Sequence, residues 1–493
     1  MLNRRFSQRG HASLSTELPG ATPGSGWQAP RMRGALVAAT ALAGLWLVAT
    51  VLRTPVEPNP PTDPSGQAGG ASPSLIDSAV AKAHNRVPGS ADVASSGLKA
   101  VSLTDEYLRQ SAPRIGLAEA RLIGIYQLIS QARHREALVQ TEQLVRDHPN
   151  FQLAHLVHGD LLSLQAHPVR QLGDVPDTKA LAAAVQLTAL REESRRRLRA
   201  LTERPPEGSV PTQFLTLSPQ SRHAIAIDAS RSRLYLFENL NAVRGAHGVD
   251  RAPRLKLLGD FYISVGLQGI EKSVEGDKRT PLGVYYITSN LNPADLPDLY
   301  GVGALPINYP NPLDMQRGKT GSGIWLHGTP SDQFVRAPQA SDGCVVLANP
   351  DLERLLTTVR IRTTPVVIAP SLQWVQPDAL AREREQFETV LDAWRRARGD
   401  GNLAELKGFY SERFASQGRD LAQWWPRVED ELRASKPRDL QIKDLSVLRW
   451  RDQEDTMVVT FGEVPAGRSR GVTKRQYWVR EQDRWTIFFE GTI

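Results

Sequence analysis

The chain has almost no cysteine, since Cys344 is the single one among its 493 residues. A lone thiol cannot form an intramolecular disulfide, so no internal disulfide stabilises this fold. The sequence also lacks a dinucleotide-binding loop, a phosphate-binding glycine loop and any cluster with metal-ligand spacing. We therefore expect no cofactor and no metal. Four histidines lie close in sequence, but without cysteines or a suitable carboxylate set they favour surface or packing roles: His148, His155, His158 and His167.

Concentrated positive charge is missing from most of the chain. The formal net charge is +7, but five arginines crowd the N-terminus: Arg4, Arg5, Arg9, Arg31 and Arg33. No basic patch with interleaved aromatic residues occurs elsewhere, so we predict no nucleic-acid partner.

One long apolar run is present, at residues 34–52, without a charge or a proline. Its length predicts a transmembrane anchor. The preceding arginines favour a cytoplasmic segment 1–33, which predicts a single-pass inner-membrane protein with its catalytic portion in the periplasm. The rival interpretation is a cleaved signal peptide, but Leu52-Arg53-Thr54-Pro55 offers no small-x-small cleavage site. Residues 53–100 are rich in proline, glycine and serine, which predicts a flexible linker.

The remaining sequence predicts a multidomain fold of three folded units. Residues 101–205 have helical periodicity, and 132–164 resemble one tetratricopeptide unit, so we expect a tetratricopeptide-like helical domain that could meet a protein partner. Residues 220–370 are mainly β, with a hairpin at 223–239 and strands within 255–266, 284–290, 322–328 and 364–370. Residues 378–493 begin with an amphipathic helix, 379–398, and continue as four alternating strands. This order resembles the cone-shaped α+β fold of nuclear-transport-factor-2-like (NTF2-like) domains.

Sixteen residues separate His327 from Cys344 in the β-rich region. A nucleophilic cysteine needs to be a thiolate, and a nearby imidazole can take its proton or hold it in an ion pair. Gly343 permits a tight turn, so we expect the N–H groups of Gly343 and Cys344 to face a developing oxyanion. Asn349-Pro350-Asp351 predicts a helix over 350–359 with Asn349 as its N-cap.

The pairing of His327-Gly328-Thr329 with Ser341-x-Gly343-Cys344, preceded by residues 276–287, resembles the YkuD-type L,D-transpeptidases. The resemblance covers residues 220–370. It implies that Cys344 is the nucleophile, that His327 is its general base, and that the Gly328 carbonyl orients the imidazole. Ser341 and Gly343 take the motif positions beside the nucleophile.

Two positions depart from the family pattern, because Asp342 stands where histidine is frequent and Val346 where arginine is frequent. Without that arginine the substrate carboxylate needs another partner, and Arg279 or Arg336 could supply the charge. We include Asp342 among the expected substrate-binding residues.

The resemblance implies that the protein acts on stem tetrapeptides of peptidoglycan through a cysteine thioester. The leading prediction is transpeptidation in cell-wall cross-linking or remodelling. The first alternative is an L,D-carboxypeptidase that trims tetrapeptide to tripeptide and affects cell shape. The second is a non-catalytic scaffold that binds the wall.

Overall fold

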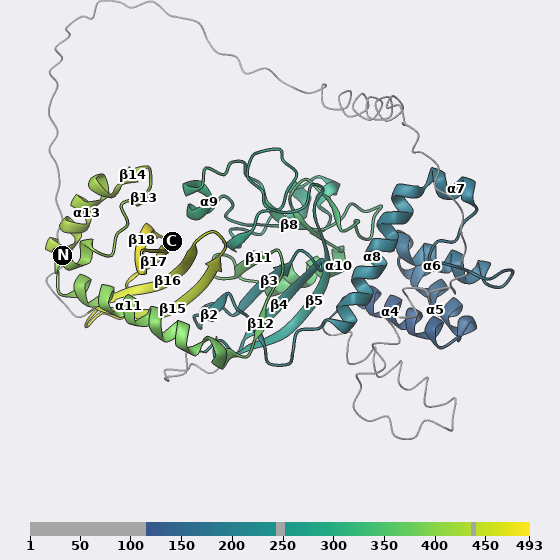
Figure 1. The fold of residues 1–493 in the computed structure, drawn as a ribbon, viewed down its shortest axis with the longest axis horizontal. Helices are drawn as coiled ribbons and strands as arrows, with labels where there is room; N and C mark the ends of the chain where they lie inside the picture. The colour runs from purple at the N-terminus through teal and green to yellow at the C-terminus, as the bar shows by residue number, and fades with distance from the viewer. Residues whose placement is uncertain (1–114, 243–251, 435–439) are drawn as a thin grey trace, which may run out of the picture. The chain divides into compact units, whose positions relative to one another are not determined.

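The computed structural model describes residues 115–242, 252–434 and 440–493 (Figure 1). The predicted anchor at 34–52 and the linker at 53–100 lie outside these residues. Across the three described ranges, no helix combines the length and the apolar character needed to cross a bilayer.

Residues 117–202 form the helical domain. Its helices are α4 (Leu117–Ser130), α5 (His134–Asp147), α6 (Gln152–Ser163), α7 (Asp177–Ala182) and α8 (Ala184–Thr202). Residues 132–164, which resemble one tetratricopeptide unit, form a helix pair around Pro149 and Asn150, because α5 ends at Asp147 and α6 begins at Gln152. The apolar positions of α4, α5, α6 and α8 meet in one buried cluster that includes Leu122, Leu144 and Leu161.

The central domain contains a nine-stranded sheet in the order β6-β11-β3-β4-β5-β10-β8-β7, with β9 paired to β5. Its strands are β3 (His223–Asp228), β4 (Arg233–Asn239), β5 (Leu255–Gly266), β6 (Gly283–Tyr286), β7 (Ala304–Pro306), β8 (Trp325–His327), β9 (Gln339–Ser341), β10 (Val345–Leu347) and β11 (Pro365–Ala369). Apolar side chains on one side of it, such as Ile225, Phe261 and Val366, form a buried core. This core fixes the strand ends from which the site residues project.

Short helices complete the central domain, among them η1 (Leu240–Ala242), η2 (Pro293–Asp295), η3 (Asp298–Tyr300), α9 (Pro312–Gln316) and α10 (Asn349–Thr358). Helix α10 begins one residue earlier than predicted, and its N-cap is Ala348. The prediction that Asn349 caps this helix is therefore wrong. The Asn349 side chain instead binds the backbone of Thr329: Oδ1 accepts from Thr329 N at 3.1 Å and Nδ2 donates to Thr329 O at 2.9 Å.

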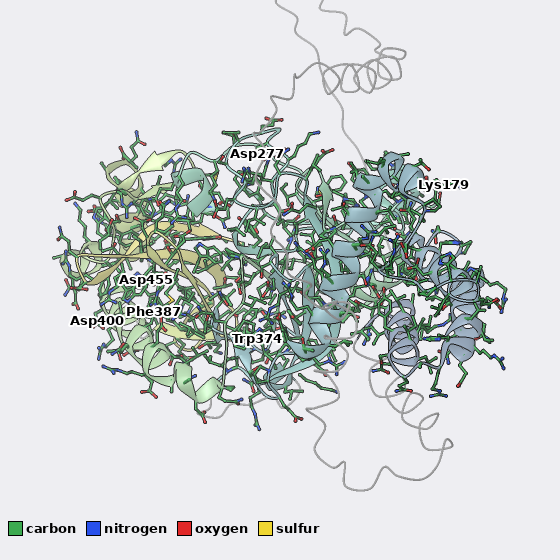
Figure 2. All side chains as sticks on the ribbon, turned by 45° about the vertical axis from the view of Figure 1, so that its right-hand side comes forward. Lys179, Asp277, Trp374, Phe387, Asp400 and Asp455 are labelled. Carbon is green, nitrogen blue, oxygen red and sulfur yellow. The ribbon has the colours of Figure 1, made fainter. Side chains whose placement is uncertain are left out.

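The C-terminal domain contains η4 (Pro377–Leu380), α11 (Ala381–Gly399), α12 (Leu403–Lys407), α13 (Leu421–Ala434) and the small strands β13 (Ala415–Ser416) and β14 (Arg419–Asp420). Its main strands are β15 (Leu440–Arg451), β16 (Asp455–Pro465), β17 (Val472–Glu481) and β18 (Arg484–Thr492). The four predicted strands are confirmed. Phe387 (labelled in Figure 2) and Trp394 on α11 belong to one buried cluster with Trp478 of the sheet, as the amphipathic pattern predicts.

Two strand pairs connect the segment that precedes the central domain to the segment that follows it. Strand β2 (Phe214–Thr216) precedes the central domain but pairs with β15, so it becomes the fifth strand of the C-terminal sheet. Strand β1 (Val210–Pro211) pairs with β12 (Trp374–Val375), which follows the central domain. The central domain therefore begins and ends at neighbouring points, next to the β1–β12 pair.

A buried network of charges connects the helical and central domains. Glu119 of α4 accepts from Arg197 of α8 at 2.9 Å and from Arg233 of β4 at 2.8 Å. Arg233 also binds Asp260 of β5 at 2.6 Å, and Arg197 binds Glu193 at 2.8 Å. Because the charges are paired and hydrogen-bonded, removing one member would leave an uncompensated charge in the interior.

Candidate active site

The candidate site lies where β8 and β10 run parallel. Leu326 is in register with Val345, and His327 with Val346. The residue before Val345 is Cys344, which by this register lies beside Trp325. Since alternate residues of a strand face the same side, and paired residues of adjacent strands share a side, Cys344 and His327 face the same side of the sheet. Leu326 and Val345 point the other way, into the core.

His327 is buried, with 3% of its surface exposed. Its Nδ1 lies 2.7 Å from the carbonyl oxygen of Gly328. With Nδ1 donating its proton to that carbonyl, Nε2 carries the lone pair, which is the tautomer a general base requires. Burial, opposed by the Gly328 hydrogen bond and helped by the charge of Arg336, lowers the pKa of His327 to about 4. The imidazole is therefore neutral at physiological pH.

The Cys344 thiol has two hydrogen-bond partners in the described part of the chain. The Trp325 N–H donates to Sγ at 3.4 Å, and the thiol donates to the Gly323 carbonyl at 3.5 Å. Burial raises the pKa of the thiol, against the Trp325 N–H and the positive charges of Arg336 and Lys272. Because the thiol pKa is raised and the imidazole pKa is lowered, both groups are neutral at rest, so His327 suits proton abstraction during the reaction rather than a resting ion pair.

The turn ahead of Cys344 is held by two buried hydroxyl groups. Ser341 Oγ donates to the Cys344 carbonyl at 2.6 Å and accepts from the Gly343 N–H at 3.2 Å. Thr280 Oγ1 donates to the Gly343 carbonyl at 2.9 Å. The expectation that the Gly343 N–H faces an oxyanion is therefore wrong, because Ser341 occupies it. Among the described residues we find no acceptor for the Cys344 N–H, which makes it the better oxyanion donor.

Gly343 itself is required by the backbone. Its φ is +122°, and a Cβ there would lie 2.7 Å from the Arg279 carbonyl oxygen. A side chain at this position would push the turn, and Cys344 with it, away from its place.

The two candidate arginines differ in where their charge lies. The Arg279 guanidinium donates to the Ile270 carbonyl at 2.9 Å. Arg336 is half-buried, donates to the Leu299 carbonyl at 3.5 Å, and its charge acts on both Cys344 and His327. The Asp342 side chain is 85% exposed, with Lys278 Nζ 3.6 Å from its Oδ1. Of the two arginines, Arg336 is therefore the one whose charge acts on the thiol and the imidazole.

Comparison with known proteins adds the family. Residues 222–368 match the model of the YkuD L,D-transpeptidase catalytic domain. This segment is an L,D-transpeptidase catalytic domain. Residues 386–491 match the Cds6 C-terminal NTF2-like domain, which agrees with the helix-then-sheet order of the C-terminal domain. A comparison with curated proteins returned no match.

Several solved structures resemble the chain. Bd1075 of Bdellovibrio bacteriovorus is 22% identical, with a TM-score of 0.47, over 58% of this chain and 98% of that one. The helical cell shape determining protein Pgp2 of Campylobacter jejuni is 20% identical, with a TM-score of 0.44, over 57% of this chain and 95% of that one. An L,D-transpeptidase from Mycobacterium smegmatis is 12% identical, with a TM-score of 0.18, over 30% of this chain and 58% of that one.

The L,D-transpeptidase domain also contains site residues that no sequence pattern marks. Tyr300 packs edge-on against the His327 ring, with centroids 5.0 Å apart, and its carbonyl accepts from the Gly328 N–H at 3.0 Å. Buried Lys272 donates to Asp277, labelled in Figure 2, at 2.8 Å and contributes positive charge near Cys344. The only sequence signal near either was the Gly276–Ile287 segment, which indicated the family but not these contacts.

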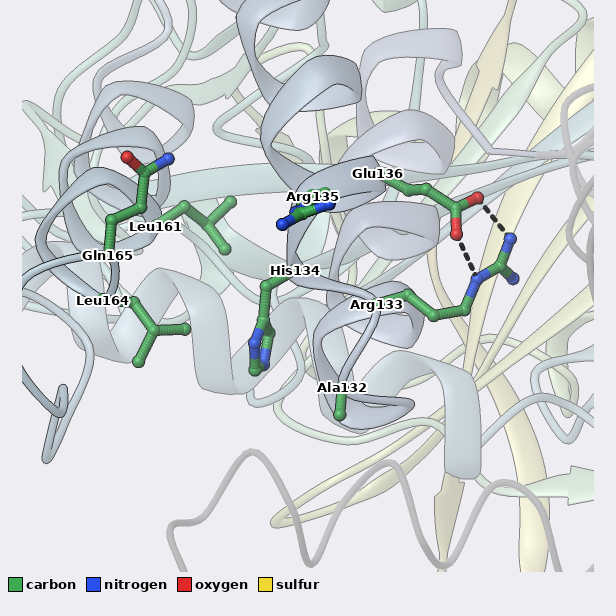
Figure 3. A pocket seen from close by; sticks show the side chains of 8 residues that line it. All are labelled: Ala132, Arg133, His134, Arg135, Glu136, Leu161, Leu164 and Gln165. Carbon is green, nitrogen blue, oxygen red and sulfur yellow. Dashed lines mark hydrogen bonds and ion pairs between the residues drawn. The ribbon is translucent and has the colours of Figure 1, made fainter.

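A hollow of about 490 Å³ in the helical domain contains none of these residues. It lies between the start of α5 and the end of α6, and Arg133 and Glu136 pair with each other on the α5 side, with Nε to Oε1 at 2.7 Å (Figure 3). Among the described residues no group of His, Cys, Asp or Glu has the arrangement of a metal site.

Proposed function

We propose that the protein acts on peptidoglycan stem tetrapeptides, with Cys344 as nucleophile and His327 as general base. The observation that carries this proposal is the register of β8 and β10, which puts both side chains on one side of the sheet in an L,D-transpeptidase domain. The fixed tautomer of His327 supports the same roles, because Nε2 is the atom left to accept a proton.

The proposed first step transfers the Cys344 proton to His327 Nε2 as Sγ bonds to the carbonyl carbon of the L-centre of the diamino acid. The carbonyl oxygen takes the negative charge and receives the Cys344 N–H. The C–N bond to the terminal D-alanine then breaks, and the His327 imidazolium returns the proton to the leaving amine. A thioester remains on Cys344, and an amine of a second stem peptide resolves it in transpeptidation.

Arg336 is the proposed partner of the substrate carboxylate. Val346 leaves no cation at the position where the family frequently has arginine, whereas the charge of Arg336 acts on the thiol and the imidazole. A guanidinium holds a carboxylate through two parallel hydrogen bonds, which would orient the end of the stem peptide.

Mass spectrometry of the purified full-length chain after incubation with a disaccharide tetrapeptide tests the chemistry. We expect a tripeptide thioester on Cys344 and none on Cys344→Ala. His327→Ala should lose the adduct, whereas His155→Ala, which changes an exposed histidine of α6, should keep it. No adduct on a folded wild-type chain with monomeric or polymeric substrate would favour the scaffold alternative.

The products of the same reaction separate the two enzymatic outcomes. Cross-linked dimers support the transpeptidase. Tripeptide without dimers would mean that water resolves the thioester, and the proposal would change to an L,D-carboxypeptidase.

We also propose that residues 34–52 anchor the protein in the inner membrane with the catalytic portion in the periplasm. The apolar run and the arginines before it support this placement. Release of the full-length chain from membranes by alkaline carbonate would contradict it.

A further inference from the structure

The loop that follows His327, residues 328–338, is anchored in the helical domain. Phe334 of this loop is 8% exposed and belongs to the core cluster of the helices. Its ring stacks on Phe151, with centroids 4.5 Å apart, and packs against His148 at 4.9 Å. The loop is therefore held by an apolar anchor that comes from outside the L,D-transpeptidase domain.

Hydrogen bonds to the turn between α5 and α6 reinforce this anchor. The Phe334 N–H donates to the Asn150 carbonyl at 3.2 Å, and Asn150 Nδ2 donates to the Ser331 carbonyl at 3.1 Å. Within the loop, Thr329 Oγ1 donates to the Phe334 carbonyl at 3.2 Å. Two residues after Phe334 comes Arg336, so the anchor fixes the backbone that carries the arginine.

A second contact reaches Arg336 from α8. The Arg197 guanidinium lies over the Tyr262 ring, 4.0 Å from its centroid. Tyr262 OH in turn donates to the Arg336 carbonyl at 3.1 Å. The helical domain thus holds the loop both before Arg336 and at Arg336.

The Arg336 guanidinium donates to the Leu299 carbonyl at 3.5 Å, next to Tyr300, whose ring packs on His327. We propose that the helical domain sets the position of Arg336 at this site, with Phe334 as the positioning residue and Arg336 as the residue that selects an anionic substrate group. The stem-peptide part of this inference rests on the proposed function. The positioning part does not, because it concerns the charge that any reagent meets at Cys344.

The single cysteine allows a direct test, since alkylation of the full-length chain reports Cys344 alone. The probes are iodoacetate, which is an anion, and iodoacetamide, which is neutral and of similar size. We expect Arg336→Gln to lower the ratio of iodoacetate to iodoacetamide rates several-fold. Phe334→Ala should lower this ratio to a similar value while the iodoacetamide rate changes less than the ratio. Combining the two substitutions should lower it no further.

Leu144→Ala is the matched control, because Leu144 is buried in the same helical core but lies within α5, outside the loop and the α5–α6 turn that binds it. It should leave the ratio at the wild-type value. If Phe334→Ala does not fold, Phe334→Leu and Asn150→Ala replace it, and each should lower the ratio in part. A wild-type ratio in the folded Phe334 and Asn150 variants would overturn the proposal.

A substrate experiment tests the deeper claim. We expect the wild-type enzyme to prefer a tetrapeptide to its C-terminal amide, mainly through KM, and Phe334→Ala and Arg336→Gln to lose this preference. Equal KM values for acid and amide in the wild type would overturn the anion-selecting role. A wild-type chain inactive on both peptides, with the alkylation ratios as expected, would instead reject the proposed function and keep the positioning.

Discussion

Thr280 Oγ1 donates a hydrogen bond to the carbonyl of Gly343, at 2.9 Å, and accepts one from the N–H of Gly266, also at 2.9 Å. A hydroxyl group far upstream in the sequence thus joins the end of β5 to the peptide next to Cys344. Thr280 is fully buried, so neither partner could turn to solvent if the hydroxyl were removed.

Thr280→Val should lower kcat by about tenfold, because a buried carbonyl and a buried N–H would each lose a partner, at about 1–3 kcal/mol. Thr280→Ser keeps the hydroxyl and should stay close to wild type. Steady-state kinetics on a stem tetrapeptide measure both. Equal losses in the two variants would contradict the hydrogen-bond argument.

Gly343→Ala should lower kcat by about 100-fold, because the new Cβ would meet the Arg279 carbonyl and displace Cys344. Gly276→Ala is the control, since Gly276 also has positive φ, +78°, but has open space around its Cβ position. That variant should keep most of the activity. Comparable inactivation of both would assign the effect to backbone conformation and not to the contact.

The rate of Cys344 alkylation by iodoacetamide should keep rising with pH beyond the ordinary pKa of a thiol. Burial raises the pKa of Cys344, and the neutral imidazole of His327 does not stabilise the thiolate at rest. Stopped-flow or quenched mass spectrometry gives the profile. An inflection below pH 7 would instead indicate a resting thiolate–imidazolium pair.

His327 should make the folded protein less stable as the pH falls from about 6.5 to about 4. Burial lowers its pKa to about 4 in the folded state, so in this window the unfolded chain binds more protons. The contribution, up to about 3 kcal/mol, is present above pH 6.5 and is lost on acidification. Urea unfolding of the wild type and of His327→Gln checks it, because the substituted chain should show a shallower decline. Identical slopes would contradict the prediction.

Glu119→Gln should destabilise the protein by about 3 kcal/mol, because Arg197 and Arg233 would lose the carboxylate they share in the interior. Burial, with the charge of Glu119, raises the pKa of nearby Asp351 to about 7. The carboxyl groups in and beside this network therefore outnumber its two arginines. Asp147→Asn removes the exposed partner of Arg121 and should cost less than about 1 kcal/mol. Urea unfolding compares the two, and similar costs would be the contrary result.

The long strands could be predicted from the sequence because their alternation extends over many residues. Strand β5 has the bounds 255–266 that its pattern indicates, and the 223–239 hairpin is present as β3 and β4. Strands β7, β9 and β10 have three residues each, too few for a period to appear. They form because distant partners align them, which local sequence does not encode.

The same contrast between local pattern and distant contact explains which site features the sequence could predict and which it could not. The spacing of His327 and Cys344 and the glycine between Asp342 and Cys344 are local features, so sequence could indicate them. Which backbone group a side chain meets depends on the whole fold. Asn349 is a residue type that favours N-caps, yet its side chain binds the backbone of Thr329. Thr280 precedes a proline in what reads as an ordinary turn, yet its hydroxyl binds the Gly343 carbonyl.

The pairing of β1 with β12 and of β2 with β15 restricts how the central and C-terminal domains can be recombined between genes. Because β2 belongs to the C-terminal sheet although it precedes the central domain, a recombination event between residues 370 and 378 would separate β2 from β15. The severed sheet would expose an unpaired edge, which invites aggregation. Residues 210–492 should therefore be exchanged between genes as one cassette, with the catalytic segment carried as an insertion within its neighbour.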